Sequence, residues 1–131
     1  MDNRELINEA LDARNNSYSP YSEFAVGAAL LAKDGRVFKG CNVENGAYGP
    51  SICAERVAFF KAVSEGIMEF EKIAVLGGPA GKDISSFCPP CGVCRQVMSE
   101  FCKDDFEIIL FDGSNIAQYT MKELLPLAFE L

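Results

Sequence analysis

Apolar residues recur at helical spacing in some segments of the chain and form short unbroken runs in others. Between residues 2 and 15, Leu6, Ile7 and Ala10 fall on one side of a helix, which Asp2 or Asn3 is placed to cap. The same patterns predict helices over 53–65, 91–101 and 121–125, and strands over 24–33, 36–43, 72–77, 106–111 and near Ile116. The stretch 77–90 is rich in Gly, Pro and Ser, and we predict a single long loop there.

The order of these elements predicts the fold class. It is an α/β protein in which helices cover both faces of a mixed sheet, a three-layer α/β/α sandwich. A length of 131 residues fits one domain over 1–131. Strands 36–43 and 72–77 are joined by a helix, so we expect them to run parallel with a right-handed crossover. Because each of these strands is followed by a helix, both helices begin at the same edge of the sheet, where open α/β sheets bind ligands.

The sequence contains no histidine, and this narrows the possible chemistry. Ser-His-Asp triads, Cys-His dyads and imidazole metal ligands are excluded. A general base must then be a carboxylate, and a metal ion must bind to sulfur or oxygen. The 12 Lys and Arg against 19 Asp and Glu give a net charge of −7, which disfavours tight binding of nucleic acid or of an anionic membrane.

The six cysteines indicate a metal site or a catalytic site. The first residues are polar, without the apolar segment of a secretory signal, and no apolar run approaches the ~18 residues of a membrane span. We therefore expect a cytoplasmic, reducing location and no membrane partner. In such a compartment, clustered cysteines bind metals or catalyse reactions more often than they form disulfides.

Three cysteines lie at the starts of the two helices that share a sheet edge. Cys53 begins the first helix, and Cys91 and Cys94 lie at the start of the second. Three thiolates that face one another predict a tetrahedral zinc site with one open position, which is typical of catalytic zinc. Glu55, in the first turn after Cys53, is placed to carry protons without binding the metal. A structural zinc site, closed by Cys88 or Cys41 as fourth ligand, is the alternative at this point.

Six short motifs carry a more specific signal. They are YSPYSEF at 18–24, VGAAL at 26–30, GCNVEN at 40–45, CAER at 53–56, PCGVCRQ at 90–96 and ELLP at 123–126. Together they make the chain resemble the small homotetrameric, zinc-dependent cytidine deaminases over nearly its whole length. The zinc deaminases share a signature of a zinc ligand, a nearby Glu and a later P-C-x-x-C.

The resemblance implies a reaction and a metal centre. One zinc ion per chain would be bound by Cys53, Cys91 and Cys94, and Arg56 would donate to the ligand sulfurs. Cytidine and deoxycytidine would be hydrolysed to uridine and deoxyuridine with release of ammonia, a step of pyrimidine salvage. Glu55 would take a proton from the attacking water, deliver it to N3 of the base and then protonate the departing amine. The neighbours Gly92, Arg95 and Gln96 match the family pattern and favour Cys91 and Cys94 over Cys88 as ligands.

The resemblance also implies a substrate pocket and an assembly. Asn42 and Glu44 would bind the ribose, while the Phe24 ring and the Ala54 backbone would contact the base. The whole implied set of substrate-binding residues is Phe24, Asn42, Val43, Glu44, Tyr48, Ala54 and Phe129. A homotetramer with shared active sites would bring Phe129, from the apolar tail 124–129, to a neighbouring subunit, with Tyr48 at a subunit contact.

The expected substrate is a free pyrimidine nucleoside. Glu44 at a sugar-binding position would repel a 5′-phosphate, and no cluster of Lys or Arg precedes the site. The alternatives are a blasticidin-type aminonucleoside deaminase, a non-catalytic zinc-binding module, and a thiol redox protein that uses Cys88 to Cys94. Apart from this chemistry, Arg95 is interpreted as a surface charge, and Cys41 and Cys102 as ordinary buried or half-buried thiols.

Overall fold

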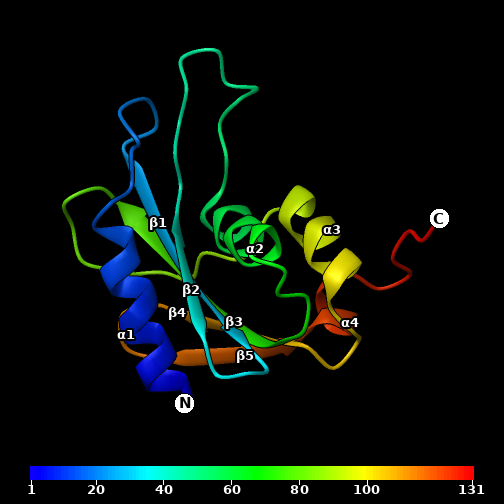
Figure 1. Ribbon diagram of the computed structural model, residues 1–131. Coiled ribbons are helices and arrows are strands. Elements are labelled where there is room, and N and C mark those ends of the chain that lie inside the picture. Colours follow the sequence, from blue (N-terminus) through cyan, green and yellow to red (C-terminus); the bar gives the residue numbers. More distant parts are fainter.

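The computed structural model describes residues 1–131 and contains one five-stranded sheet with four helices (Figure 1). In chain order the elements are α1 (Asn3–Arg14), β1 (Phe24–Ala32), β2 (Val37–Cys41), α2 (Ala54–Ser64), β3 (Phe70–Pro79), α3 (Gly92–Phe101), β4 (Glu107–Phe111), β5 (Ile116–Thr120) and α4 (Met121–Leu124). Asp2 caps α1 by accepting a hydrogen bond from the Glu5 amide, as the sequence predicts. None of these helices is long and apolar enough to cross a lipid bilayer.

The sheet is mixed, which confirms the predicted fold class. Its strand order is β2-β1-β3-β4-β5, and β1 runs antiparallel to both of its neighbours. Strands β2 and β3 therefore point in the same direction, as predicted, but β1 lies between them. The parallel neighbours are β3 and β4, which α3 connects, and β5 closes the sheet antiparallel to β4. The sequence pattern does not reveal this insertion of β1, because strand order depends on tertiary pairing.

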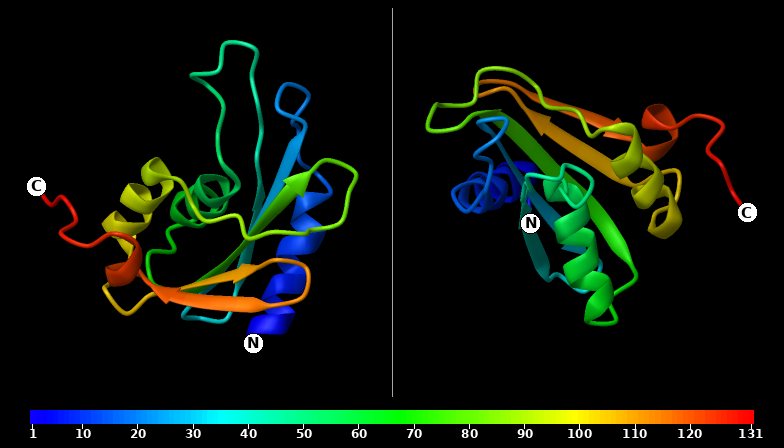
Figure 2. Two further views of the ribbon diagram at one scale, coloured as in Figure 1. Left: turned by 180° about the vertical axis from the view of Figure 1, so that it is seen from behind. Right: turned by 90° about the horizontal axis from the view of Figure 1, so that it is seen from above.

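Alternate residues of the strands pack into two separate hydrophobic cores, one on each face of the sheet. Leu6, Ile7 and Ala10 of α1 pack with Ala29 and Leu31 of β1 on one face. On the other face, Ala58 and Phe59 of α2 and Met98 of α3 pack with Ala28 and Leu30. The side-chain period of two along β1 places successive residues in different layers. Helices thus cover both faces, α1 on one and α2 with α3 on the other, as the views in Figures 1 and 2 show.

Helix α2 lies unusually close to strand β2, because Gly40 presents no side chain to it. A Cβ atom at Gly40 would lie 2.3 Å from the Ala54 carbonyl oxygen and 2.7 Å from the Ala58 amide nitrogen. Such distances are far inside van der Waals contact, so only glycine permits this approach. The first turn of α2, which carries Glu55, is therefore seated directly on the sheet.

Three strand boundaries differ from the sequence prediction by two residues, and the first is the start of β3, at Phe70 instead of residue 72. Strand β3 continues to Pro79 instead of ending at residue 77, because Phe24, Ala25 and Val26 of β1 pair with its last three residues. The predicted loop is correspondingly shorter at its start. Strand β2 ends at Cys41, and Val43 forms only isolated bridges with Tyr18 and Ile52. The segment between β2 and α2 then extends well beyond the rest of the molecule (Figures 1 and 2).

Candidate active site

Cysteine occupies the N-cap position of both helices that begin at the carboxyl edge of the sheet. Cys53 precedes α2 and Cys91 precedes α3, both with extended backbone, and neither side chain makes a capping hydrogen bond to a backbone amide of its helix. N-cap side chains are usually Ser, Thr, Asp or Asn, whose oxygen accepts from the first turn. Here the two sulfur atoms remain available for other partners. The predicted meeting of the two helix starts at one edge is what the structure shows.

The Sγ atoms of Cys53, Cys91 and Cys94 form a compact group, called the sulfur cluster below. Cys53 Sγ lies 3.8 Å from Cys91 Sγ, which lies 3.5 Å from Cys94 Sγ. All three sulfur atoms fall within 4.8 Å of one another. Zinc–sulfur bonds of about 2.3 Å in tetrahedral geometry require sulfur atoms about 3.8 Å apart. The cluster therefore fits a tetrahedral zinc ion with three sulfur ligands and one position left for a further molecule.

The three thiols of the cluster lie in different surroundings. Cys94 is buried, Cys53 is half-buried and Cys91 is exposed. Arg56 donates from Nη2 to Cys53 Sγ at 3.5 Å, and its Nε is buried without an acceptor. Hydrogen bonds from the Cys94 and Arg56 side chains lower the pKa of Cys53 to about 5, whereas the same contact with Cys53 raises the pKa of Cys94. A thiol with a lowered pKa is readily ionised, as a metal ligand must be.

The carboxylate of Glu55 lies within the first turn of α2 and is 4% exposed. Burial, followed by the negative charge of Cys53, raises the pKa of Glu55 to about 7. No salt bridge neutralises this side chain. A buried carboxylate that gains and loses a proton near neutral pH is suited to general acid and base catalysis.

A cavity of about 290 Å³ opens next to the sulfur cluster and Glu55. It is lined by Val26, Asn42, Ser51, Ile52, Cys53, Ala54, Glu55, Arg56, Cys88, Pro89 and Cys91. Six of the eleven are residues that the sequence singled out as site residues. The others include Val26 and Cys88, whose side chains meet beside Gly77, where a Cβ would lie 2.9 Å from Val26 Cγ2 and 3.1 Å from Cys88 Sγ. The sequence does not show that these two residues meet, because they come from β1 and from the segment before α3.

Cys88 lies in the wall of the cavity but outside the sulfur cluster. Burial, with the nearby charges of Glu55 and Cys53, raises the pKa of Cys88 to about 11. The overlapping C-x-x-C of the sequence is therefore divided by the fold: Cys91 and Cys94 face Cys53, and Cys88 does not join them.

Two of the expected sugar-binding residues hold the surrounding loops. Asn42 is buried at 9% exposure; its Oδ1 accepts from the Val26 amide at 2.9 Å, and its Nδ2 donates to the Phe24 carbonyl at 2.8 Å. Glu44 accepts from the amides of Tyr21 and Ser22 at 3.1 and 3.0 Å and from the Ser22 hydroxyl. These bonds order the segment between α1 and β1. Asn42 lines the cavity, and Glu44 lies outside its wall.

The remaining expected substrate contacts do not meet in a single chain. Ala54 lines the cavity, whereas Phe24, Val43, Tyr48 and Phe129 do not. Tyr48 is 74% exposed in the projecting segment between β2 and α2, where its ring packs edge-on against Tyr21. Phe129 is 69% exposed in the C-terminal tail, which extends away from the sheet in both views of Figure 2. Both aromatic rings therefore remain mostly exposed in the single chain.

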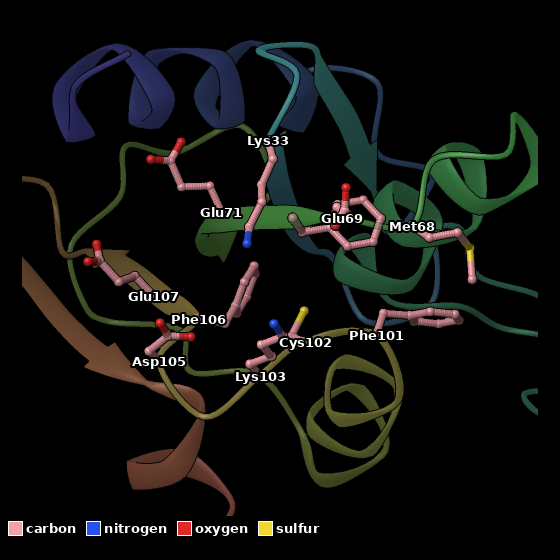
Figure 3. A pocket seen from close by; sticks show the side chains of 11 residues that line it. Lys33, Met68, Glu69, Glu71, Phe101, Cys102, Lys103, Asp105, Phe106 and Glu107 are labelled. Atoms are coloured by element: carbon pink, nitrogen blue, oxygen red, sulfur yellow. The ribbon is translucent and has the colours of Figure 1, made fainter.

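A second hollow, of about 250 Å³, lies at the opposite end of the sheet (Figure 3). It is bordered by Glu69 and Glu71 at the start of β3, by Glu107 at the start of β4, and by Lys33 after β1. None of its lining residues belongs to the sulfur cluster or to the expected substrate-binding set. This hollow therefore shares no residue with the cavity beside Glu55.

Arg95 is not the simple surface charge that the sequence suggests. Its Nε donates to the Pro90 carbonyl at 2.8 Å, and its Nη1 donates to the Leu124 carbonyl at 2.9 Å. Its neighbour Gln96 donates weakly to the Phe129 carbonyl, at 3.4 Å. Both acceptors of Arg95 are backbone carbonyls outside α3, and a sequence motif gives no sign of such hydrogen bonds.

Comparisons with known proteins agree with this geometry. A family model described as the cytidine and deoxycytidylate deaminase zinc-binding region matches residues 1–110. Proteins named cytidine deaminase from Halalkalibacterium halodurans and Sporosarcina psychrophila are 50% and 48% identical over 130 residues, which is 98% of this chain and 95% and 92% of theirs. The crystal structure of cytidine deaminase from Burkholderia pseudomallei superposes with a TM-score of 0.90 at 45% identity, covering 98% of this chain and all of that one. With the sulfur cluster and Glu55 in place at the shared edge, the chain belongs to the cytidine and deoxycytidylate deaminase zinc-binding family.

Proposed function

We propose that this protein is a zinc-dependent cytidine deaminase, which hydrolyses cytidine and deoxycytidine to uridine and deoxyuridine with release of ammonia. The observation that carries this proposal is the buried carboxylate of Glu55 in the same cavity as Cys53 and Cys91 of the sulfur cluster. A non-catalytic zinc module would need neither the open fourth ligand position nor a carboxylate beside it. Relatives that are named cytidine deaminase and match over nearly the whole chain favour this function over that of a blasticidin-type enzyme.

Cys53, Cys91 and Cys94 are the residues that would hold one zinc ion. When bound, zinc supplies a Lewis acid that makes water nucleophilic near neutral pH. Three thiolates exceed the charge of the ion and leave the centre with a net charge of about −1. The guanidinium of Arg56 at Cys53 and the N-termini of α2 and α3 place positive charge next to this centre. We also propose a cytoplasmic location. That compartment is reducing and would keep the six cysteines free of disulfide bonds.

Glu55 carries the protons of the reaction. Its carboxylate takes one proton from water as the water oxygen attacks C4 of the base, and it delivers that proton to N3 as the N3–C4 double bond becomes single. It then transfers the remaining hydroxyl proton to the exocyclic amine, and the C4–N4 bond breaks to release ammonia and the uracil carbonyl. The pKa near 7 suits both directions of transfer, because the group is neither a strong acid nor always ionised at neutral pH.

The substrate we propose is the free nucleoside. The cavity of about 290 Å³ is lined mainly by small and apolar side chains, and Arg56, its one cationic lining residue, is already engaged with Cys53. Glu44 adds a negative charge outside the cavity wall, where it is held by Ser22 and Tyr21. A phosphate group would find no free cationic partner there. Equal kcat/KM values for cytidine and cytidine monophosphate would contradict this choice of substrate.

The experiment that tests the proposed function replaces Glu55 by glutamine. Glu55→Gln keeps the size and polarity of the side chain but removes its capacity to accept a proton. We expect zinc content to stay at one ion per chain while kcat for cytidine falls by about 10³-fold, within the usual range for a lost general acid or base. Zinc is measured by atomic absorption and turnover by the absorbance change of the base. A Glu55→Gln protein with wild-type turnover would overturn the proposal.

A further inference from the structure

Arg95 connects two parts of the chain that are far apart in sequence. It lies in α3, one residue after the cluster residue Cys94, and its side chain runs back toward the start of the helix. There Nε donates to the Pro90 carbonyl at 2.8 Å, while Nη1 donates to the Leu124 carbonyl at 2.9 Å at the end of α4. One rigid guanidinium thus bonds to the residue directly before Cys91 and to the C-terminal helix.

These two carbonyls depend on Arg95 for their hydrogen bonds. Pro90 is fully buried, and no backbone amide donates to its carbonyl oxygen. Leu124 is the last residue of α4, where carbonyl groups have no helical partner, and it too lacks a backbone donor. A positive charge near the start of a helix is unfavourable for the helix dipole. The position of Arg95 is therefore explained by its two acceptors and not by α3 itself.

Cys91 is the member of the sulfur cluster with the least support of its own. Cys94 is buried in the core and Cys53 receives a hydrogen bond from Arg56, but Cys91 is exposed. The next residue, Gly92, has no atom within 4 Å of the place where a Cβ would lie. No neighbouring side chain therefore confines this turn from outside, so the position of Cys91 Sγ depends on the backbone at Pro90.

We propose that Arg95 is a positioning residue that holds Cys91 in place for the metal, using the C-terminal helix α4 as its anchor. The inference rests on the proposed function only in taking the sulfur cluster as the zinc site. Helix α4 is itself held at its start by a capping box, in which Thr120 and Glu123 exchange hydrogen bonds. The same contact ties the metal ligand to the segment that leads into the exposed tail carrying Phe129.

The test measures metal binding directly, with Arg95→Ala, Arg95→Lys and the surface control Arg36→Ala in the full-length protein. Arg36 is exposed and pairs with Asp34 in the turn between β1 and β2, so its loss removes an arginine without touching the site. Zinc affinity is obtained by competition with a chromogenic chelator. Cobalt substitution adds a second readout, because its thiolate charge-transfer and d–d absorption bands report the number and geometry of sulfur ligands. Thermal unfolding of the metal-free proteins measures stability separately.

We expect Arg95→Ala to weaken zinc binding by about 10- to 100-fold, as for lost partners of metal ligands, and to alter the cobalt spectrum. Arg95→Lys can reach only one carbonyl at a time, so its affinity should lie between Arg95→Ala and wild type. Arg36→Ala should bind zinc as wild type does. If Arg95→Ala does not fold, Arg95→Lys decides alone: wild-type affinity and an unchanged cobalt spectrum would overturn the inference. Failure of the wild type to bind zinc would instead overturn the proposed function.

Discussion

At the scale of single residues, the site is built from side chains with opposite electrostatic surroundings only a few residues apart. Cys53 has a lowered pKa, because hydrogen bonds from Cys94 and Arg56 stabilise its thiolate. Glu55, two residues later, has a raised pKa, because it is buried. Cys53 is thus suited to binding a metal as a thiolate, and Glu55 is suited to exchanging protons near neutral pH. Arg56 acts on both, as it contacts Cys53 and its charge lowers the pKa of Glu55.

Removing Arg56 should therefore shift the pH dependence of the reaction. Without the guanidinium, the carboxyl group of Glu55 loses a stabilising positive charge, so its pKa rises above the value of about 7. The base form is then lost at a higher pH than in wild type. For Arg56→Ala we expect the acidic limb of the kcat/KM profile to move upward in pH, with zinc retained. An unchanged profile in a zinc-loaded Arg56→Ala enzyme, alongside an unchanged Arg36→Ala control, would contradict this role.

The sequence reveals residues whose roles depend on local position and misses those whose roles depend on contact. Cys53, Cys91 and Glu55 can be predicted because each lies in the cap or first turn of a helix, which the local pattern defines. The hydrogen bonds of Asn42 to Val26 and Phe24 cannot, because they cross between β1 and the end of β2. Arg95 belongs to the second kind, since its acceptors lie before α3 and at the end of α4.

At the scale of elements, the position of α2 on the sheet decides where Glu55 lies. The close approach at Gly40 leaves no space for a methyl group, since the Ala54 carbonyl would be 2.3 Å from it. The predicted start of α2 is accurate, because the polar-to-apolar change after Ser51 is local. The predicted end of β3 is less accurate, because its last residues are strand only through their pairing with β1.

Gly40→Ala should displace the first turn of α2 from β2. We expect a loss of about 1–3 kcal/mol in the free energy of unfolding, as for other overpacked sites. Activity should fall by about 10²-fold or more, because a shift near 1 Å at a catalytic group costs this much. Gly49→Ala is the control: a Cβ there meets only the Ala47 carbonyl at 4.0 Å, and its unfolding should match wild type. Denaturant unfolding and turnover are the measurements, and a fully active, stable Gly40→Ala enzyme would refute the packing argument.

At the scale of the whole molecule, the layered sandwich follows from the order of helices and strands, but the completed site does not. The cavity beside Glu55 is lined by Val26 of β1, by Asn42 after β2, by residues 51–56 at the start of α2 and by the segment before α3. Tyr48 and Phe129 remain exposed on projections from this body. The sequence predicts the layers because each apolar face must be covered, whereas contacts made between chains cannot be derived from one chain. We propose that a homotetramer covers both aromatic rings and completes the substrate pocket.

Deletion of residues 126–131 tests this assembly. The deletion removes Phe129 and the exposed Leu127, but it leaves α4 and the Leu124 carbonyl intact. We expect the protein to lose both its oligomeric state, measured by sedimentation velocity, and most of its turnover. A shorter deletion of residues 130 and 131 keeps Phe129 and should preserve both properties. A fully active monomer lacking 126–131 would rule out a shared active site.

The central claim is that one zinc ion on Cys53, Cys91 and Cys94 supports the reaction. Its most direct test is the zinc content of the wild type, Cys91→Ser and Cys88→Ser, with cytidine turnover measured on the same samples. Cys91 belongs to the sulfur cluster, while Cys88 shares its cavity without joining it. We predict one zinc per chain and full turnover to persist in Cys88→Ser, and both to be lost in Cys91→Ser. A metal-free wild type that still deaminates cytidine, or loss of zinc in Cys88→Ser with retention in Cys91→Ser, would contradict the account.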